Sequence, residues 1–340
     1  MYPLKDKILS IIKNISTELY LVHKQNILLE NLKVYNRCYS AIYLLEDITE
    51  ALEYYKSCDG SKFELGAKYL MVYGVLEALF LQQDALNDLL DALGYKKINY
   101  KDNYAEIYAI RKTRNDIAGH PTNRTSTQYT TYLSRPDLSL KKIRYEETQN
   151  DTFIDFDILS SINIQENFIK NQLEEILNNL QKEKKEHIEK FKNDKLTDCF
   201  QMFNYAYEKT YSISGFYTQN DTLGFSLVKD IIEKLKEKLC KRFVNWENTN
   251  FASDIKFVED IYKYLLLKPE IINEEGNENK FLKRNLLENM FTHLKELKDM
   301  AKEVDAEYEN NFKIHYSADN TILHKITIKN ENNEEIELNI

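Results

Sequence analysis

Arg114 and His120 are the two side chains whose types and spacing are best suited to chemistry in this sequence. Five residues separate them, and Asn115 follows the arginine directly. A guanidinium presents planar N–H donors that match phosphate oxygens. An imidazole can accept or donate a proton near neutral pH. The pair therefore has the components of an acid–base site acting on a phosphate group.

The position of Arg114 on its predicted helix is unusual. Ile107, Ile110 and Ile117 recur at helical spacing, and residue 114 continues the face that they form. An arginine turned toward a packed face is costly unless it has a partner or a function. The pattern therefore marks Arg114 as a residue kept for a specific interaction.

His120 is predicted to lie where this helix ends. Gly119 can leave the helical conformation, and Pro121 biases His120 away from it. Asp116 precedes the histidine by four residues, so its carboxylate could orient the imidazole if the helix persists that far. The sequence thus predicts an imidazole that a substrate can reach at a helix terminus.

Charge restricts how the chain can meet nucleic acid. The net charge is −9 and the pI is near 5.4, which argues against non-specific binding over the whole surface. Five of the eight arginines fall between residues 111 and 144 and form one local basic stretch. Its candidate RNA-binding residues are Arg111, Lys112, Arg124, Arg135, Lys141, Lys142 and Arg144. The alternative is a solvated loop that happens to be basic.

The elements that must position these residues are predicted to be mainly helices. Only 8 glycines and 4 prolines interrupt the 340 residues. Apolar residues at spacings of three and four predict helices over about 4–22, 32–55, 65–93, 103–119 and from 161 to 180. A β-hairpin is expected as an insertion at about 135–157.

A second domain is predicted after a charged helical connector at residues 181–189. This places the boundary near residue 185, between a helical domain at 1–185 and a C-terminal domain at 186–340. The second domain is expected to hold three further helices and a small antiparallel sheet, with strands near 312–316, 321–329 and 335–340. The expected fold class is therefore mainly α, an antiparallel helical bundle followed by a second helical domain that ends in strands.

The segment from Arg114 and Asn115 to His120 resembles the signature of the HEPN superfamily. That signature is an arginine, four to six residues and a histidine, commonly with Asn, Asp or His after the arginine. The layout of long antiparallel helices also fits, and the resemblance covers about residues 1–180. It implies a metal-independent endoribonuclease in which two protomers bring their motifs together in a shared cleft, with RNA as substrate and a homodimer as the assembly.

The resemblance assigns a role to each residue of the motif. His120 would take the proton of the ribose 2′-OH or protonate the leaving 5′-oxygen, and the partner's copy would supply the complementary step. Arg114 would stabilise charge on the phosphate. Asn115 would hold the helix end or donate to the phosphate, and Asp116 would orient the imidazole. The products would be a 2′,3′-cyclic phosphate and a 5′-hydroxyl, and DNA should resist.

Two alternatives stay open. Arg114 could pair with an acidic side chain while His120 caps the last carbonyls, which would leave a catalytically inactive helical module for RNA binding or dimerisation. Thr122 stands where toxins of this superfamily often have a tyrosine that nucleotidyltransferase antitoxins modify. Control by that modification is therefore not expected here.

No metal or cofactor is expected, because none of the five other histidines lies in a tight metal-ligand spacing. The four cysteines form no C-x-x-C pair and are expected to be reduced thiols of a cytoplasmic protein. The first helix is amphipathic and resembles neither a signal peptide nor a membrane span. A toxin or antiviral-defence effector, with a regulatory protein or guide RNA as further partner, is the role that the resemblance suggests.

Overall fold

A computed structural model of the chain consists mostly of helices, with two small antiparallel sheets of three strands each. The structure describes residues 3–21, 24, 28, 31–119, 130–148, 151–211, 219–268, 271, 276–308, 314–315, 325–329 and 335–339. The mainly helical class predicted from the sequence is confirmed. None of the described helices is long and apolar enough to cross a membrane.

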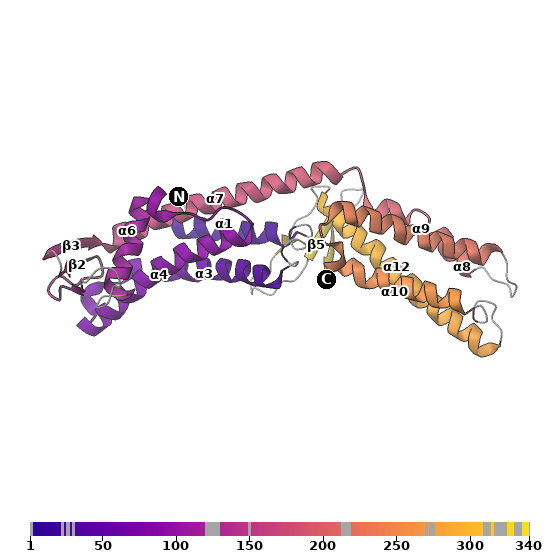
Figure 1. Cartoon of the computed structure of the whole chain (residues 1–340), viewed down its shortest axis with the longest axis horizontal. Coiled ribbons are helices and arrows are strands. Elements are labelled where there is room, and N and C mark those ends of the chain that lie inside the picture. The colour runs from indigo at the N-terminus through magenta and orange to yellow at the C-terminus, as the bar shows by residue number, and fades with distance from the viewer. Residues whose placement is uncertain are drawn as a thin grey trace. The chain divides into compact units, whose positions relative to one another are not determined.

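Contacts divide the chain into two units (Figure 1). Unit 1 comprises residues 1–19 and 31–181, and unit 2 comprises residues 20–30 and 182–340. The domain boundary predicted from the sequence places residues 20–30 in the first domain instead. In the structure Lys24 of this segment pairs with Glu183, and both belong to unit 2.

The helices of unit 1 follow the predicted pattern closely (Figure 1). They are α1 (Leu4–Leu19), α3 (Leu32–Ser57), α4 (Leu65–Ala92), α5 (Tyr100–Asn103), α6 (Ala105–Arg114) and the first part of α7 (Ile158–Phe191). The helix predicted over 103–119 corresponds to α6 and the turn after it, and the short helix α5 before it was not predicted. Tyr104 has φ −142° and ψ 73°, which separates α5 from α6, and a π-helical turn over Asn115–Gly119 follows α6.

A polar network inside unit 1 connects α4, α6 and α7. Gln83 and Gln165 are both fully buried. The Gln83 amide donates to Gln165 Oε1 at 2.8 Å and to the Ile107 carbonyl at 3.2 Å, and the Gln165 amide donates to the Leu79 carbonyl at 2.8 Å. Because buried polar groups need partners, these bonds favour one placement of α6 against α4. Gln83, the polar residue in an otherwise apolar seam, thus helps to position the helix that carries Arg114.

The insertion in unit 1 contains the predicted hairpin, which a third strand extends to a three-stranded sheet. Strands β2 (Lys142–Glu147) and β3 (Thr152–Asp157) lie where the sequence placed them, and β1 (Thr131–Leu133) pairs with β2 on the other side. The prediction missed β1 because three residues are too few to show the alternation of a strand. Ile143 and Tyr145 of β2 are buried with residues of α3, α4 and α6, so the sheet packs on the helices.

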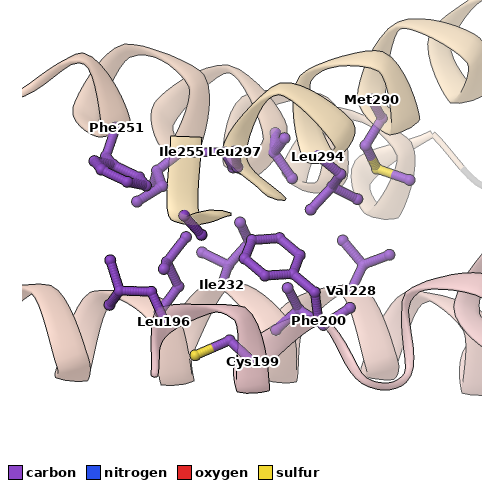
Figure 2. Close-up of a cluster of buried hydrophobic side chains, with 14 of the residues drawn as sticks. Leu196, Cys199, Phe200, Val228, Ile232, Phe251, Ile255, Met290, Leu294 and Leu297 are labelled. Carbon is purple, nitrogen blue, oxygen red and sulfur yellow. The ribbon is translucent and has the colours of Figure 1, made fainter. Parts of the chain in front are cut away.

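Unit 2 is a second helical core. Its helices are the end of α7, α8 (Phe203–Tyr211), α9 (Gln219–Arg242), α10 (Asn250–Leu267) and α12 (Asn277–Tyr308), with a 3₁₀ turn over Leu196–Phe200. Figure 2 shows Phe200, Val228 and Ile232 facing Ile255 and Leu294 across the core. The tail forms β4 (Ile314–His315), β5 (Lys325–Lys329) and β6 (Glu335–Asn339), which agrees with the predicted strands.

A buried carboxylate stabilises unit 2 from inside. Asp305 of α12 accepts hydrogen bonds from the backbone N–H groups of Leu196 and Thr197, at 3.0 and 2.9 Å, and from the Thr197 hydroxyl at 2.8 Å. Arg242 of α9, whose side chain is 1% exposed, pairs with the same carboxylate at 3.1 Å. One side chain thus joins α9, α12 and the 3₁₀ turn.

Candidate functional site

The C-terminal end of α6 and the following π turn carry the motif. Ile107 and Ile110 anchor α6 in the core of unit 1, and Ile117 anchors the turn. A π-helical turn widens the backbone spiral by one residue, a feature found often at functional sites. It also rotates the residues after Arg114 away from the positions that a regular helix would give them. His120 itself lies outside the described residues.

Arg114 is held against α4 by a carboxylate and an aromatic ring. Its Nε and Nη2 atoms each lie 2.7 Å from Glu77 Oε2, and its Nη1 donates to Asn115 Oδ1 at 3.0 Å. The guanidinium carbon lies 4.2 Å from the centre of the Phe80 ring, a cation–π contact. The arginine side chain remains 19% exposed, and Glu77 is 41% exposed. The group is therefore ordered at the surface and not sealed in the core.

Gly119 leaves space for this guanidinium. A Cβ atom added at Gly119 would lie 2.8 Å from Arg114 Nη1 and 3.3 Å from Asn115 Oδ1. Contacts under 3.0 Å require a shift, and Glu77, Asn115 and Phe80 restrain the guanidinium from giving way. A glycine here thus permits the close approach of arginine and backbone that the site requires.

We expect Gly119→Ala to lower the free energy of unfolding by about 1 kcal/mol, because the new methyl group displaces a held side chain. Gly66→Ala is the matched control. Gly66 is in α4 with nothing within 4 Å of an added Cβ, so alanine should instead stabilise the helix by up to about 1 kcal/mol. Urea denaturation of both variants measures the difference, and an equal gain in both would contradict the role of Gly119.

Asp116 is directed into unit 1, with 2% exposure. Its Oδ2 accepts a hydrogen bond from the Tyr145 hydroxyl at 3.3 Å, and its carbonyl accepts one from the Thr131 hydroxyl. Burial and the nearby Asp116 carboxylate raise the pKa of Tyr145 to about 12, so the phenol stays protonated and can donate. Asp116 therefore connects the π turn to β1 and β2. Its predicted role toward the imidazole involves a residue outside the described part of the chain.

Two arginines of the basic stretch, Arg111 and Arg144, are paired closely with acids. Arg111 pairs with Asp84 at 2.8 Å and lies 3.8 Å from the centre of the Phe80 ring. On the sheet, Arg144 forms a bidentate pair with Asp155, at 2.7 and 3.0 Å. The structure therefore brings Arg111 close to Arg114 on one aromatic ring, whereas Arg144 belongs to a separate ion pair on the sheet.

The remaining predicted RNA-binding residues are more open. Lys142 lies 3.4 Å from Asp157, with its side chain 72% exposed. Lys112, Arg135 and Lys141 are exposed. Arg124 lies outside the described residues. Exposed cations are thus present both on α6 and on the inserted sheet.

Several residues around the motif were not found from the sequence. Glu77, Phe80 and Asp84 lie on one side of α4 and hold Arg111 and Arg114. Glu77 and Phe80 are three residues apart, and Phe80 and Asp84 are four apart. This helical spacing could have shown that the three side chains share one face of α4, beside the apolar seam. Nothing in the sequence indicated that this face would contact α6.

No family model, no curated protein and no solved structure matches the chain. The resemblance to the HEPN superfamily therefore stays a prediction, which rests on the motif and on the layout of helices predicted from the sequence.

Proposed function

We propose that the chain is a metal-independent endoribonuclease of HEPN type. The observation that carries the proposal is the ordered, partly exposed guanidinium of Arg114 at the end of α6, one residue before Asn115 and six before His120. Its contacts with Glu77 and Asn115 do not use all five N–H donors of a guanidinium. Donors remain for phosphate oxygens at the point where the helix ends.

The reaction uses the nucleophile that RNA itself carries. One imidazole takes the proton of the 2′-OH, which attacks the adjacent phosphorus, and a second imidazole gives a proton to the departing 5′-oxygen. Arg114 stabilises the added negative charge on the phosphate, and Glu77 and Phe80 keep it oriented beforehand. Two protomers supply the two copies of His120 in a composite site at a homodimer interface.

The biological role that accompanies this activity is that of a toxin or antiviral-defence effector in the cytoplasm. A cleaving enzyme of this kind needs control, so a regulatory protein or guide RNA is part of the proposal. Residues 182–340 of unit 2 lie outside the resemblance and are the part of the chain available for that control.

The experiment is cleavage of a structured RNA by the full chain in EDTA. We expect 2′,3′-cyclic phosphate and 5′-hydroxyl ends, no cleavage of the same sequence as DNA, and a rate about 10²–10⁴-fold lower for His120→Ala. Arg284→Ala, at an exposed residue of unit 2, is the control and should cleave like the parent protein. Cleavage that EDTA abolishes, or that persists in His120→Ala, would overturn the proposal.

A second candidate is a catalytically inactive helical module that binds RNA or dimerises. The specific observation in its favour is the Arg114–Glu77 ion pair, because the Glu77 carboxylate already pairs with the Nε and Nη2 groups of the guanidinium. Under this alternative Arg114 serves only to join α6 to α4. RNA retained on the purified protein without cleavage, in the presence or absence of EDTA, would favour it.

A further inference from the structure

One edge of the packed pair α10 and α12, within unit 2, brings three potential metal ligands together. Asp254 comes from α10, and His293 and Glu296 come from α12. One coordinating atom of each lies within 4.8 Å of the others. His293 Nδ1 lies 2.8 Å from Asp254 Oδ1 and 3.1 Å from Glu296 Oε2. None of these residues belongs to the motif of unit 1.

The two carboxylates converge on a single nitrogen atom. A neutral imidazole nitrogen can carry one hydrogen or one lone pair, so it cannot satisfy both acids fully. Within the described part of the chain, no lysine or arginine pairs with Asp254 or Glu296. Two carboxylates therefore share one imidazole nitrogen, an arrangement in which a divalent cation could take all three groups as ligands.

The surroundings hold the three groups in place. Asp254 and His293 have side chains 18% and 28% exposed, whereas Glu296 is 54% exposed and faces solvent. The His293 ring packs on Phe257, with 4.1 Å between ring centres. Neighbouring residues Ile255 and Leu294 are in the core, so both helices are fixed beside the cluster. Figure 2 shows these two side chains on the same side of that core.

The distances suit a small divalent ion. Bonds of about 2.0–2.2 Å to nitrogen and oxygen separate neighbouring ligand atoms by about 3–3.5 Å. The observed separations of 2.8 and 3.1 Å are close to this range, and small rotations of the exposed Glu296 can open the site. We propose that Asp254, His293 and Glu296 bind a divalent transition-metal ion such as Zn²⁺ or Co²⁺.

The donor set selects the class of ion. One imidazole with two carboxylates favours Zn²⁺, Co²⁺ or Mn²⁺ over Mg²⁺ and Ca²⁺, which prefer oxygen ligands alone, and over ions that prefer thiolates. Three protein ligands leave coordination positions for water or another ligand. The site is separate from the proposed ribonuclease motif, and it is tested without RNA.

The test is titration of the EDTA-stripped, full-length chain with Zn²⁺ by calorimetry and with Co²⁺ by visible absorption. We expect one saturable ion per chain, a Co²⁺ spectrum of a site with nitrogen and oxygen ligands, and a higher melting temperature with metal. Losing a group that contacts only a metal ligand typically weakens metal binding by roughly 10–100-fold. Asp254→Asn and Glu296→Gln should each weaken binding of the ion by more than this, because both side chains are proposed to bind it directly.

Glu288→Gln is the matched control, because Glu288 is also an acid of α12 but pairs with Arg284. It should bind both ions like the parent protein. Glu296 is exposed, so its glutamine variant keeps the fold even if changes at Asp254 do not. Absence of saturable binding, or equal affinity in the parent and Glu296→Gln, would overturn the proposal.

Discussion

Arg114→Ala is expected to lower the rate of RNA cleavage by about 10²–10³-fold, the usual effect of removing a donor that stabilises charge in the transition state. The reason is that Arg114 is the cation fixed at the end of α6, with its guanidinium partly exposed. Single-turnover cleavage of a labelled RNA in EDTA measures the effect. Arg114→Lys should recover only part of the rate, because an ammonium lacks the planar donors of a guanidinium.

Glu77→Gln is the matched control, since it removes the same ion pair from the other side. A pair with partners 19% and 41% exposed contributes about 0–1 kcal/mol, so Glu77→Gln should change the rate by no more than about fivefold. If Arg114 served only to join α6 to α4, the two variants would behave alike. Equal cleavage rates in Arg114→Ala and Glu77→Gln would therefore show that Arg114 joins the two helices and does not act on the phosphate.

The helices of this chain could be predicted because their signal is local. α1, α3 and α4 bury apolar residues at spacings of three and four, and the sequence alone shows these stripes. The predicted end of the helix at residue 93 is close to the end of α4 at Ala92, and Gly94, which follows, has a φ of 76° that favours glycine. The break at Tyr104 was not predicted, because it depends on how α5 and α6 pack and not on a glycine or proline.

The candidate site could be predicted only in part, because its partners are distant in sequence. The motif itself could be found in the sequence, since Arg114, Asn115 and His120 lie within one short segment. Glu77 precedes Arg114 by 37 residues, and Tyr145 follows Asp116 by 29. The hydrogen bond that the Asp116 carboxylate accepts from the inserted sheet was not predicted, and the proposed contact of Asp116 with the imidazole stays a prediction. Only the fold shows which acids and phenols reach a given side chain.

The cluster of Asp254, His293 and Glu296 was also not predicted from the sequence, because its residues come from two helices. A search for histidines in tight metal-ligand spacing found none, because Asp254 lies 39 residues before His293 on another helix. The spacing of three between His293 and Glu296 does place both on one face of α12, which was the available signal. Antiparallel packing of α10 and α12 supplies the third ligand.

Asp305→Ala is expected to lower the free energy of unfolding by about 3–5 kcal/mol, the largest loss of stability among the substitutions proposed for this chain. The substitution leaves the Arg242 guanidinium, 1% exposed, without its carboxylate, and it removes the acceptor of the Leu196 and Thr197 N–H groups. Urea denaturation followed by the fluorescence of Trp246 measures the effect. Trp246 is the one tryptophan of the chain and is buried in the core of unit 2, so it reports on this unit.

Arg242→Met separates the two contributions of the Asp305 carboxylate, which are its ion pair with Arg242 and the hydrogen bonds that it accepts from Leu196 and Thr197. The methionine can fill the space beside Tyr308, and Asp305 keeps its three donors from Leu196 and Thr197. The loss should therefore be smaller than in Asp305→Ala, because a carboxylate with hydrogen bonds is better compensated than a buried guanidinium without its carboxylate partner.

Glu288→Ala removes a surface pair with Arg284 and should change stability by less than about 0.5 kcal/mol. It controls for the loss of any acid from α12. If Asp305→Ala were as mild as this control, the Asp305 carboxylate would contribute little, and unit 2 would be stabilised by its apolar core alone. If Arg242→Met were as damaging as Asp305→Ala, the ion pair and not the hydrogen bonds donated by the backbone N–H groups of Leu196 and Thr197 would account for the whole effect.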